Sequence, residues 1–280
     1  MANQVFKAWA GIGLALAVGS AVAAGDEIDM HFEGHYNGPW QWESLTMQHT
    51  TQSSGLHQTI TYTGTVAITG YTGNETDLVI PETIAWQYDL TSSDNSLSTH
   101  YSCEVEVTEI RTFQTTATSV TVPNSVTNIG DWAFVSAHSP NLQSITMGEG
   151  VKHIGWYAFS ECKNLTSIVI PDNVESIEEG AFCHCPGLES VTIGNGIETW
   201  GTQVFADCTS LSSVTLAEGL KGIGESAFSG CTSLASIDIP NSVKSIGNGA
   251  FLRCSSLESV SLGNDVADLG GFAFSDARGL

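Results

Sequence analysis

Positive charge is what this sequence has least of. Its 280 residues contain 8 Lys and Arg against 30 Asp and Glu, which gives a net charge of −22, and the stretch from Ala8 to Ile110 contains neither Lys nor Arg. Binding to nucleic acid or to an anionic membrane requires clustered cations that displace counterions. We therefore expect neither nucleic acid nor an anionic membrane surface as a partner.

Signatures of catalysis are also missing from the sequence. It contains no Gly-x-Ser-x-Gly motif, no phosphate-binding loop, no His-Glu-x-x-His motif and no Cys-x-x-Cys pair. Each of these motifs places a nucleophile, a metal or a phosphate on a defined turn, so their absence removes the common hydrolase, kinase and metalloprotease classes. We expect a protein that is not an enzyme and that needs no cofactor.

Long apolar runs are absent beyond the first 24 residues. Residues 1–24 carry Lys7, then an apolar run from Ala8 to Val18, then small residues up to Ala24. This order is typical of a secretory signal peptide. An uncleaved membrane anchor is the alternative, but the run is short for a membrane span. The sequence therefore predicts a secreted or cell-surface protein.

Residues 25–117 form an acidic region that we expect to be rich in β-strands. Trp40 and Trp42 would share one face of an extended strand and could stack on sugar rings, or they could pack in a small β core. Asp29, His31, Glu33 and His35 also alternate, and such a row can hold a divalent ion or simply lie on a surface strand. We expect no metal site here.

A 23-residue repeat fills residues 118–280. We number its positions from Leu165, so that position 1 is Leu, positions 4 and 6 are aliphatic, position 7 is often Pro or Gly, and positions 17 and 18 are Ala-Phe. The alternation over positions 3–6 predicts a short strand with one apolar face. A single unit cannot bury these side chains, so we expect seven stacked units that share a parallel sheet and an internal ladder of Phe side chains.

The repeated pattern resembles the BspA-type leucine-rich repeat of bacterial and protist surface proteins. The resemblance covers residues 118–280 and rests on the unit L-x-x-[VI]-x-[IL]-P-x-x-[VI]-x-x-I-G-x-x-A-F-x-x-C. It implies a right-handed leucine-rich-repeat solenoid, mainly β with short turns or helical segments, and a binding or adhesion role. It implies no catalytic residues, because the motif consists of packing positions.

Both ends of the array depart from the repeat. Residues 78–84 resemble a first strand and Val107–Ile110 a second aliphatic pair, with an insertion from Ala85 to Cys103, as expected of a degenerate capping repeat. Leu280 is position 1 of a further unit, so we expect no cap at that end. Either the chain is a fragment, or its open end docks onto another chain.

Five cysteines recur at position 21 of the repeat: Cys162, Cys185, Cys208, Cys231 and Cys254. Disulfides or a metal ladder are conceivable in such a column. The flanking units carry Ala137 and Ala277 at this position, which favours a column of small, packed thiols. Cys103 and Cys183 lie off the column and are the remaining candidates for oxidised or reactive thiols.

The outward positions of the strands predict a flat face of small hydroxyl groups. Its candidate binding residues are Ser144, Thr146, Ser167, Ser190, Thr192, Ser213, Thr215, Ser236 and Asp238. Such residues suit a crowded parallel sheet in any case. They could also form an extended surface for a protein or glycan, or an ice-binding ladder. Trp132 and Trp156, with Tyr157, are a second candidate patch, which we expect on the outside of a turn.

Our leading hypothesis is a non-enzymatic, extracellular protein-interaction or adhesion module. Its partner would be a protein or glycan on a cell surface or matrix. One alternative is a structural component that self-associates through the open end of the array. Another is a glycan-binding protein that uses the aromatic residues near the N-terminus.

Overall fold

The structure is a computed structural model, and it describes residues 33–35, 40–54, 57–91 and 98–280. The expected signal peptide (1–24), Asp29 and His31 lie outside these residues. The chain divides into two compact units, residues 1–73 with 81–109, and residues 74–80 with 110–280. We call the second unit the array, and we describe each unit separately.

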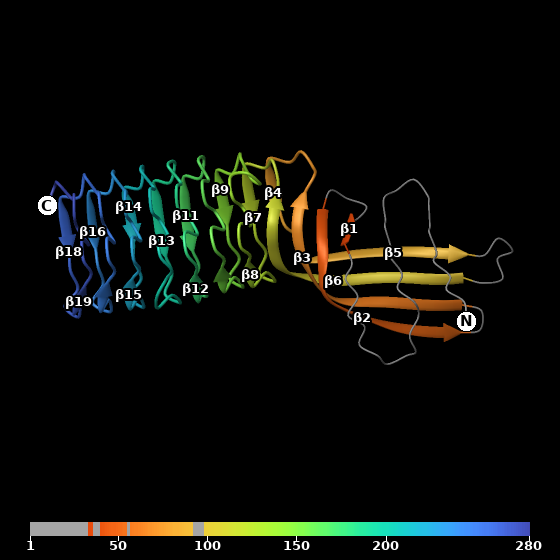
Figure 1. Cartoon of the computed structure of the whole chain (residues 1–280). Helices are drawn as coiled ribbons and strands as arrows, with labels where there is room; N and C mark the ends of the chain where they lie inside the picture. The colour runs from red at the N-terminus through yellow and green to blue at the C-terminus, as the bar shows by residue number, and fades with distance from the viewer. Residues whose placement is uncertain (1–32, 36–39, 55–56, 92–97) are drawn as a thin grey trace. The chain divides into compact units, whose positions relative to one another are not determined.

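The first unit is a sheet of long strands that contains antiparallel pairs (Figure 1). Its strands are β1 (Glu33–His35), β2 (Trp40–Ser54), β3 (His57–Tyr71), β5 (Thr83–Thr91) and β6 (Ser98–Gln114). Strand β2 pairs with β1 and β3, β3 neighbours β6, and β5 pairs with β6. Thr-rich, β-branched sequences favour such long strands. The expected insertion from Ala85 to Cys103 forms most of the β5–β6 hairpin, in which Trp86 pairs with Cys103.

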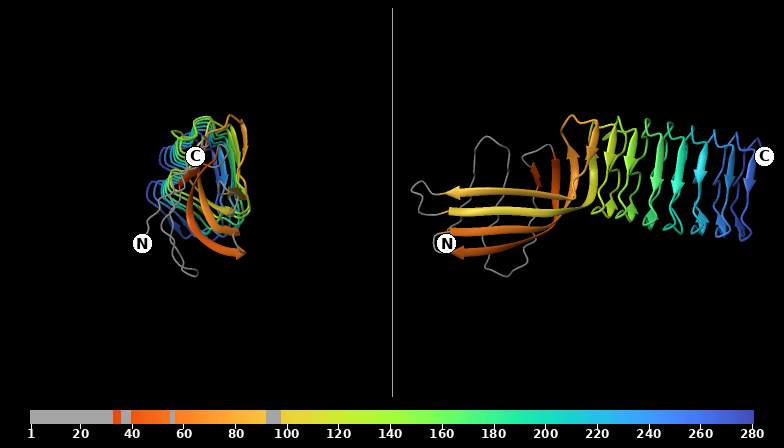
Figure 2. Two further views of the ribbon diagram at one scale, coloured as in Figure 1. Left: turned by 90° about the vertical axis from the view of Figure 1, so that its right-hand side faces the viewer. Right: turned by 180° about the vertical axis from the view of Figure 1, so that it is seen from behind.

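The first face of the array is a row of parallel strands, one from each turn of the chain (Figures 1 and 2). These strands are β4 (Asp77–Val79), β7 (Ser119–Thr121), β9 (Ser144–Thr146), β11 (Ser167–Ile170), β13 (Ser190–Ile193), β14 (Ser213–Thr215), β16 (Ser236–Asp238) and β18 (Ser259–Ser261). Equivalent residues of successive units pair, as Ile168 does with Val191. The predicted 23-residue stacking and leucine-rich-repeat fold are therefore confirmed.

A second row of two-residue strands runs along the array. It comprises β8 (Asn128–Ile129), β10 (His153–Ile154), β12 (Ser176–Ile177), β15 (Gly222–Ile223), β17 (Ser245–Ile246) and β19 (Asp268–Leu269). The row begins where the Gly130 N–H donates to the Ile110 carbonyl, so Ile110 supplies the second aliphatic position of the first turn as predicted. Short turns connect the two rows, with no helix among the described residues.

The row of two-residue strands is interrupted at one turn. Trp200 occupies position 13, where the neighbouring units have Ile177 and Ile223, and the pairing stops after β12 and resumes at β15. Trp200 is buried against Phe205 and Phe228 at ring distances of 5.8 and 5.7 Å, and its Nε1–H has no hydrogen-bond partner. The repeat pattern did not reveal this break, because Trp is itself apolar.

The predicted ladder of Phe side chains forms the core of the array. Phe134, Phe159, Phe182, Phe205, Phe228 and Phe251 are fully buried. From Phe134 to Phe274, neighbouring rings stack with centroids 4.9–5.5 Å apart and within 11° of parallel. Phe113 extends the ladder by one ring, 5.2 Å from Phe134. Phe113 was not predicted, because it follows Ile110 by three residues, whereas the repeat places Phe five residues after Ile.

Left-handed backbone conformations recur at two positions of the repeat, both of them in every turn from Leu142 onwards. At position 16 these are Trp132, Tyr157, Gly180, Gln203, Ser226, Gly249 and Phe272. At position 20 they are Glu161, His184, Asp207, Gly230, Arg253 and Asp276. Left-handed φ angles are costly for residues other than Gly. Backbone bonds between turns offset this cost: the Tyr157 N–H, for example, donates to the Glu179 carbonyl.

Candidate functional surface

The predicted hydroxyl face lies along the first row of strands. Ser144, Thr146, Ser167, Thr192, Ser213, Thr215, Ser236 and Asp238 are exposed, and Ser190 is half-buried. The inward neighbours on these strands, such as Ile168 and Val191, are buried. The alternation of the strands therefore places every candidate residue of this face on one side, as a continuous surface of small polar groups.

This face offers few anchors for tight binding. Its outward positions 3 and 5 carry no aromatic residue and no Arg on the strands from β7 to β18. Its exposed apolar side chains are Val169 (62% exposed) and, at the first strand, Val79 (65%). Aromatic and Arg side chains dominate binding energy at protein interfaces. A partner on this face would gain affinity through the number of contacts.

The two N-terminal tryptophans lie in β2, an interior strand of this sheet. Trp40 pairs with Tyr71, and Trp42 pairs with Gly34 on one side and Ile68 on the other. The register shifts between Gln41 and Trp42 because β3 has one extra residue there. The extra residue lies on β3, so the expectation that both tryptophans share one face of β2 stays a prediction.

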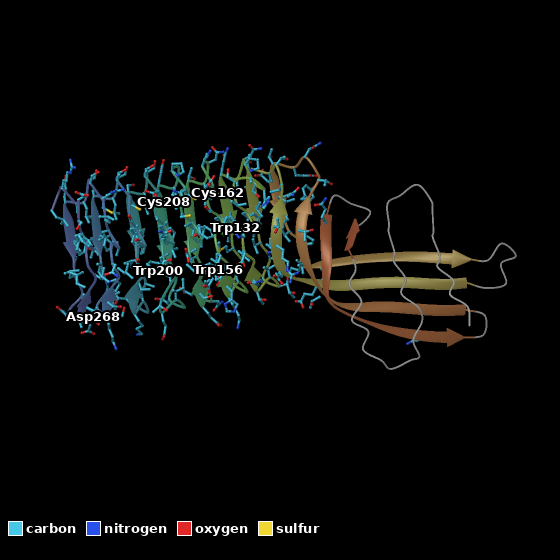
Figure 3. All side chains as sticks on the ribbon, viewed as in Figure 1. Trp132, Trp156, Cys162, Trp200, Cys208 and Asp268 are labelled. Atoms are coloured by element: carbon cyan, nitrogen blue, oxygen red, sulfur yellow. The ribbon has the colours of Figure 1, made fainter. Side chains whose placement is uncertain are left out.

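Trp132, Trp156 and the half-buried Tyr157 form an aromatic cluster on two neighbouring turns, and Figure 3 labels both tryptophans. The Trp132 and Tyr157 rings stack 4.6 Å apart and within 17° of parallel. Trp132 is 47% exposed and Trp156 is 55% exposed. The prediction that these residues lie on the outside of the turn is confirmed. The stack itself was not predicted, because the insertion before Pro140 separates the two residues by 25 positions instead of 23.

Three carboxylates border this aromatic cluster. The Trp156 Nε1–H donates to Glu178 Oε2 (3.3 Å), the Tyr157 hydroxyl donates to Glu179 Oε1 (3.0 Å), and the Trp156 backbone N–H donates to Asp131 Oδ1 (2.9 Å). The hydrogen bond to Glu179 raises the pKa of Tyr157, since it favours the protonated phenol. We call Asp131, Trp132, Trp156, Tyr157, Glu178 and Glu179 the aromatic–acidic patch.

The predicted column of thiols is buried in the array. Cys162, Cys185, Cys208, Cys231 and Cys254 are buried and free, and each Sγ donates to the carbonyl of the Phe in the preceding turn at 3.1–3.2 Å. The ladder bond between turns uses the neighbouring Ala or Val carbonyl, so the thiol adds a donor to the Phe carbonyl, which in several turns also accepts the backbone N–H of position 21 of its own turn. Figure 3 labels two members of the column, Cys162 and Cys208.

One flanking member of the column differs from the prediction. Ser139, not Ala137, occupies the position before the first cysteine: its Oγ donates to the Phe113 carbonyl at 2.9 Å and it is 1% exposed, whereas Ala137 is exposed. The two-residue insertion displaces the alignment. Position 21 is therefore occupied by a small residue that donates a hydrogen bond in every turn from Ser139 to Cys254. In the last turn Ala277 occupies it, which has no such donor.

The pKa values of four thiols of the column are raised. Burial raises the pKa of Cys208 and Cys231 well above the ordinary value and that of Cys254 to about 12. The pKa of Cys185 is raised mainly by its hydrogen bond with Cys162. Cys183 is also buried, 3.2 Å from Ser160 Oγ, and burial raises its pKa. Cys103 lies in β6, and its side chain is outside the described atoms.

No arrangement for catalysis or metal binding emerges in the part of the chain described. His184 pairs with Asp207 (3.4 Å) on the surface, without a nucleophile on the imidazole. No group of three or more His, Cys, Asp or Glu among the described residues could hold a metal ion. Of the four residues considered for a divalent ion, Glu33 and His35 lie in β1.

None of the residues that the structure describes belongs to a helix with the length and apolarity that crossing a bilayer requires.

Comparison with solved structures identifies relatives of the fold. A leucine-rich repeat protein from Bacteroides ovatus shares 28% identity at a TM-score of 0.61, over 82% of this chain and 55% of that protein. The chain thus spans little more than half the length of that relative. The leucine-rich repeat protein of T. pallidum shares 24% identity at a TM-score of 0.55, over 84% of this chain and 87% of that one.

Family comparison agrees with the architecture. No curated protein matches this chain. The model of the BspA type leucine rich repeat region matches residues 94–212 and 179–280, which together exceed half the chain. With its 23-residue turns, Phe ladder and buried Cys column, the chain belongs to the BspA-type leucine-rich-repeat family.

Proposed function

We propose that this protein is a non-enzymatic interaction module that is displayed outside the cell and adheres to another protein. The observation that carries the proposal is the division of the array into a continuous exposed polar face and an interior that holds the Phe side chains from Phe113 to Phe251 at position 18 and the column cysteines. Repeat arrays use such extended faces for binding. The extracellular location is supported by the signal-like residues 1–24, and the absence of catalytic motifs supports a binding role.

The experiment is a capture assay with the full chain on beads, with surface proteins of neighbouring or host cells as prey. In a face variant, Thr146, Thr192 and Thr215 are replaced by Arg. In a matched control with the same change of charge, Arg replaces Thr199, Thr202 and Thr209, which are also exposed but lie off the strands of the face. Substitutions at exposed positions leave stability nearly unchanged, and far-UV circular dichroism checks that both variants fold.

We expect the face variant to lose capture by about tenfold or more, because Arg is larger than the small residues that a partner must approach closely. The control variant should capture as the unmodified chain does. Equal capture by both variants, or no capture by the unmodified chain, would contradict the proposal. Sedimentation velocity over a range of concentrations is run in parallel. It detects self-association, in which copies of the chain would bind one another instead of a foreign partner.

A further inference from the structure

The aromatic–acidic patch places large aromatic residues where the backbone favours Gly. Trp132 and Tyr157 have φ angles of 60° and 53°, in the left-handed region. Units further along the array have Gly180 and Gly249 at this position. An L-residue there costs about 1 kcal/mol. The same conformation recurs at Gln203, Ser226 and Phe272, so it belongs to the repeat; what distinguishes these two turns is that their aromatic side chains stack on each other.

The patch combines exposed aromatic surface with unpaired negative charge. Trp156 stacks on no other ring within the described residues, and more than half of it is exposed. Asp131, Glu178 and Glu179 each use one oxygen in the hydrogen bonds given above, and the second oxygen of each has no partner among the described atoms. The ion pairs between described residues, Lys152 with Glu175 and His184 with Asp207, do not involve these six residues.

A planar cation with several N–H donors fits this combination. The guanidinium of Arg stacks on an indole face and donates two parallel hydrogen bonds to a carboxylate. A neutral sugar ring could stack on the indole as well, but it would cover the carboxylates without neutralising them, and covering unpaired charge is costly. The net charge of −22 would also draw a basic partner towards the chain.

We propose that the aromatic–acidic patch binds an Arg-bearing basic segment of a partner protein. The Arg guanidinium stacks on Trp156 and donates to Glu178 or Glu179. A second basic side chain lies near Trp132 and Asp131. The inference rests on the proposed interaction role, and it names a site on the array distinct from the hydroxyl face.

The test measures binding of a defined probe to the full chain by isothermal titration calorimetry at low salt. The probe is an acetylated and amidated hexapeptide, Gly-Arg-Gly-Gly-Arg-Gly. A matched peptide carries citrulline in place of Arg, which keeps the shape and removes the charge. Cellohexaose and chitohexaose represent neutral glycans. The variants are Trp156→Ala and the double variant Glu178→Gln with Glu179→Gln. Glu225→Gln is the control, because Glu225 is exposed at the same repeat position as Glu179 without an aromatic neighbour.

We expect the Arg peptide to bind, and each patch variant to weaken binding by about tenfold or more, as is typical of a central aromatic or charged contact. Glu225→Gln should stay within about twofold of the unmodified chain, and the double variant should show a shallower dependence of affinity on salt. Circular dichroism and the thermal midpoint establish that each variant is folded.

Several results would overturn the inference. They are no binding of the Arg peptide, equal loss in Glu225→Gln and the patch variants, equal binding of the citrulline peptide, or binding of an oligosaccharide that Trp156→Ala abolishes. The capture assay separates the two proposals. If the patch variants capture partners normally while the hydroxyl-face variant does not, the patch inference fails and the interaction role stands. If the unmodified chain captures nothing, the interaction role itself fails.

Discussion

At the scale of single residues, position 21 shows how one repeated site meets two requirements. The side chain must be small enough for the interior, and it must donate to the carbonyl of the Phe in the preceding turn. A thiol is a weak donor, but it is apolar enough to be buried without cost. Ser139 meets the same two requirements in the turn before that of Cys162, where its hydroxyl donates to the Phe113 carbonyl.

Replacing Ser139 tests the hydrogen-bonding requirement. We expect Ser139→Ala to lower the free energy of unfolding by about 1–3 kcal/mol, because it leaves the buried Phe113 carbonyl without a donor. Ser139→Cys should recover most of this loss, since a thiol serves in the next five turns. Urea denaturation followed by circular dichroism gives both values. If Ser139→Ala and Ser139→Cys are equally stable, the column has a packing role alone.

The pH dependence of stability tests the burial of the thiols. The pKa of Cys254 is raised to about 12 from an ordinary value of 9.0, so folding favours the neutral thiol. The stability that the neutral Cys254 thiol contributes is fully present below pH 9. The free energy of unfolding then falls as the pH rises from 9 towards 12, because in that range the thiol ionises only in the unfolded chain.

The expected slope of the free energy of unfolding against pH can be compared with the slope for a variant. Over pH 9–11 the free energy of unfolding should fall by up to about 1.4 kcal/mol per pH unit for each such thiol. Cys254→Ser removes one titrating group, so its curve should be shallower by about that amount. Urea denaturation at successive pH values supplies the measurement, and parallel curves would contradict the assignment.

At the scale of the repeated elements, stability comes from contacts between neighbouring turns. Each Phe ring lies between the rings of the adjacent turns, and each ladder bond joins one turn to the next. No turn buries its own Phe. Loss of one ring therefore weakens two interfaces.

We predict that Phe205→Ala lowers the free energy of unfolding by about 3–5 kcal/mol, the usual cost of a large cavity in a packed core. Phe274→Ala should cost less, because Phe274 is half-buried and has one stacked neighbour. Chemical denaturation of both variants provides the comparison. Equal losses at the two positions would argue against a cooperative ladder.

The turn that contains Trp200 should open more readily than its neighbours. In other turns the N–H at position 14 donates to the carbonyl at position 13 of the preceding turn, as Gly247 does to Ile223, but Gly224 makes no such bond to Trp200. We expect Trp200→Ile to restore this bond and to slow hydrogen exchange of the Gly224 amide by about tenfold. The Gly247 amide is the internal control, and an unchanged Gly224 exchange rate would refute the explanation.

At the scale of the whole molecule, the repeat allowed much of the array to be predicted. The period of 23 residues fixes which residues stack, and the apolar positions determine which side chains are buried. Features outside the period escaped prediction. Phe113 and Ser139 lie beside irregular spacings, and Trp200 keeps the apolar pattern while breaking the backbone ladder.

The candidate site was predictable in part. The hydroxyl face follows from strand alternation alone, so its exposure could be predicted. The aromatic–acidic patch could not, because the roles of Glu178 and Glu179 depend on side-chain contacts across turns. A sequence pattern shows that a position is exposed, but it does not show which exposed neighbour the side chain contacts.

The charge of the whole molecule leads to a further prediction. A net charge of −22 causes repulsion in the compact state, and salt screens it. We expect the thermal midpoint to rise by about 2–4 °C between 20 and 500 mM NaCl, as read by differential scanning calorimetry. MgCl₂ at the same ionic strength should give the same shift. A fall in the midpoint, or a much larger effect of Mg²⁺, would contradict simple screening.

The regular hydroxyl face also has a consequence for any elongated partner. Adjacent strands of a sheet lie about 4.8 Å apart, and successive strands here present nearly the same outward side chains. A polymer that binds in one alignment would find almost isoenergetic alignments one or more strands away. It could then shift along the array without full release, so residence time would grow with the number of turns even if each single contact stayed weak.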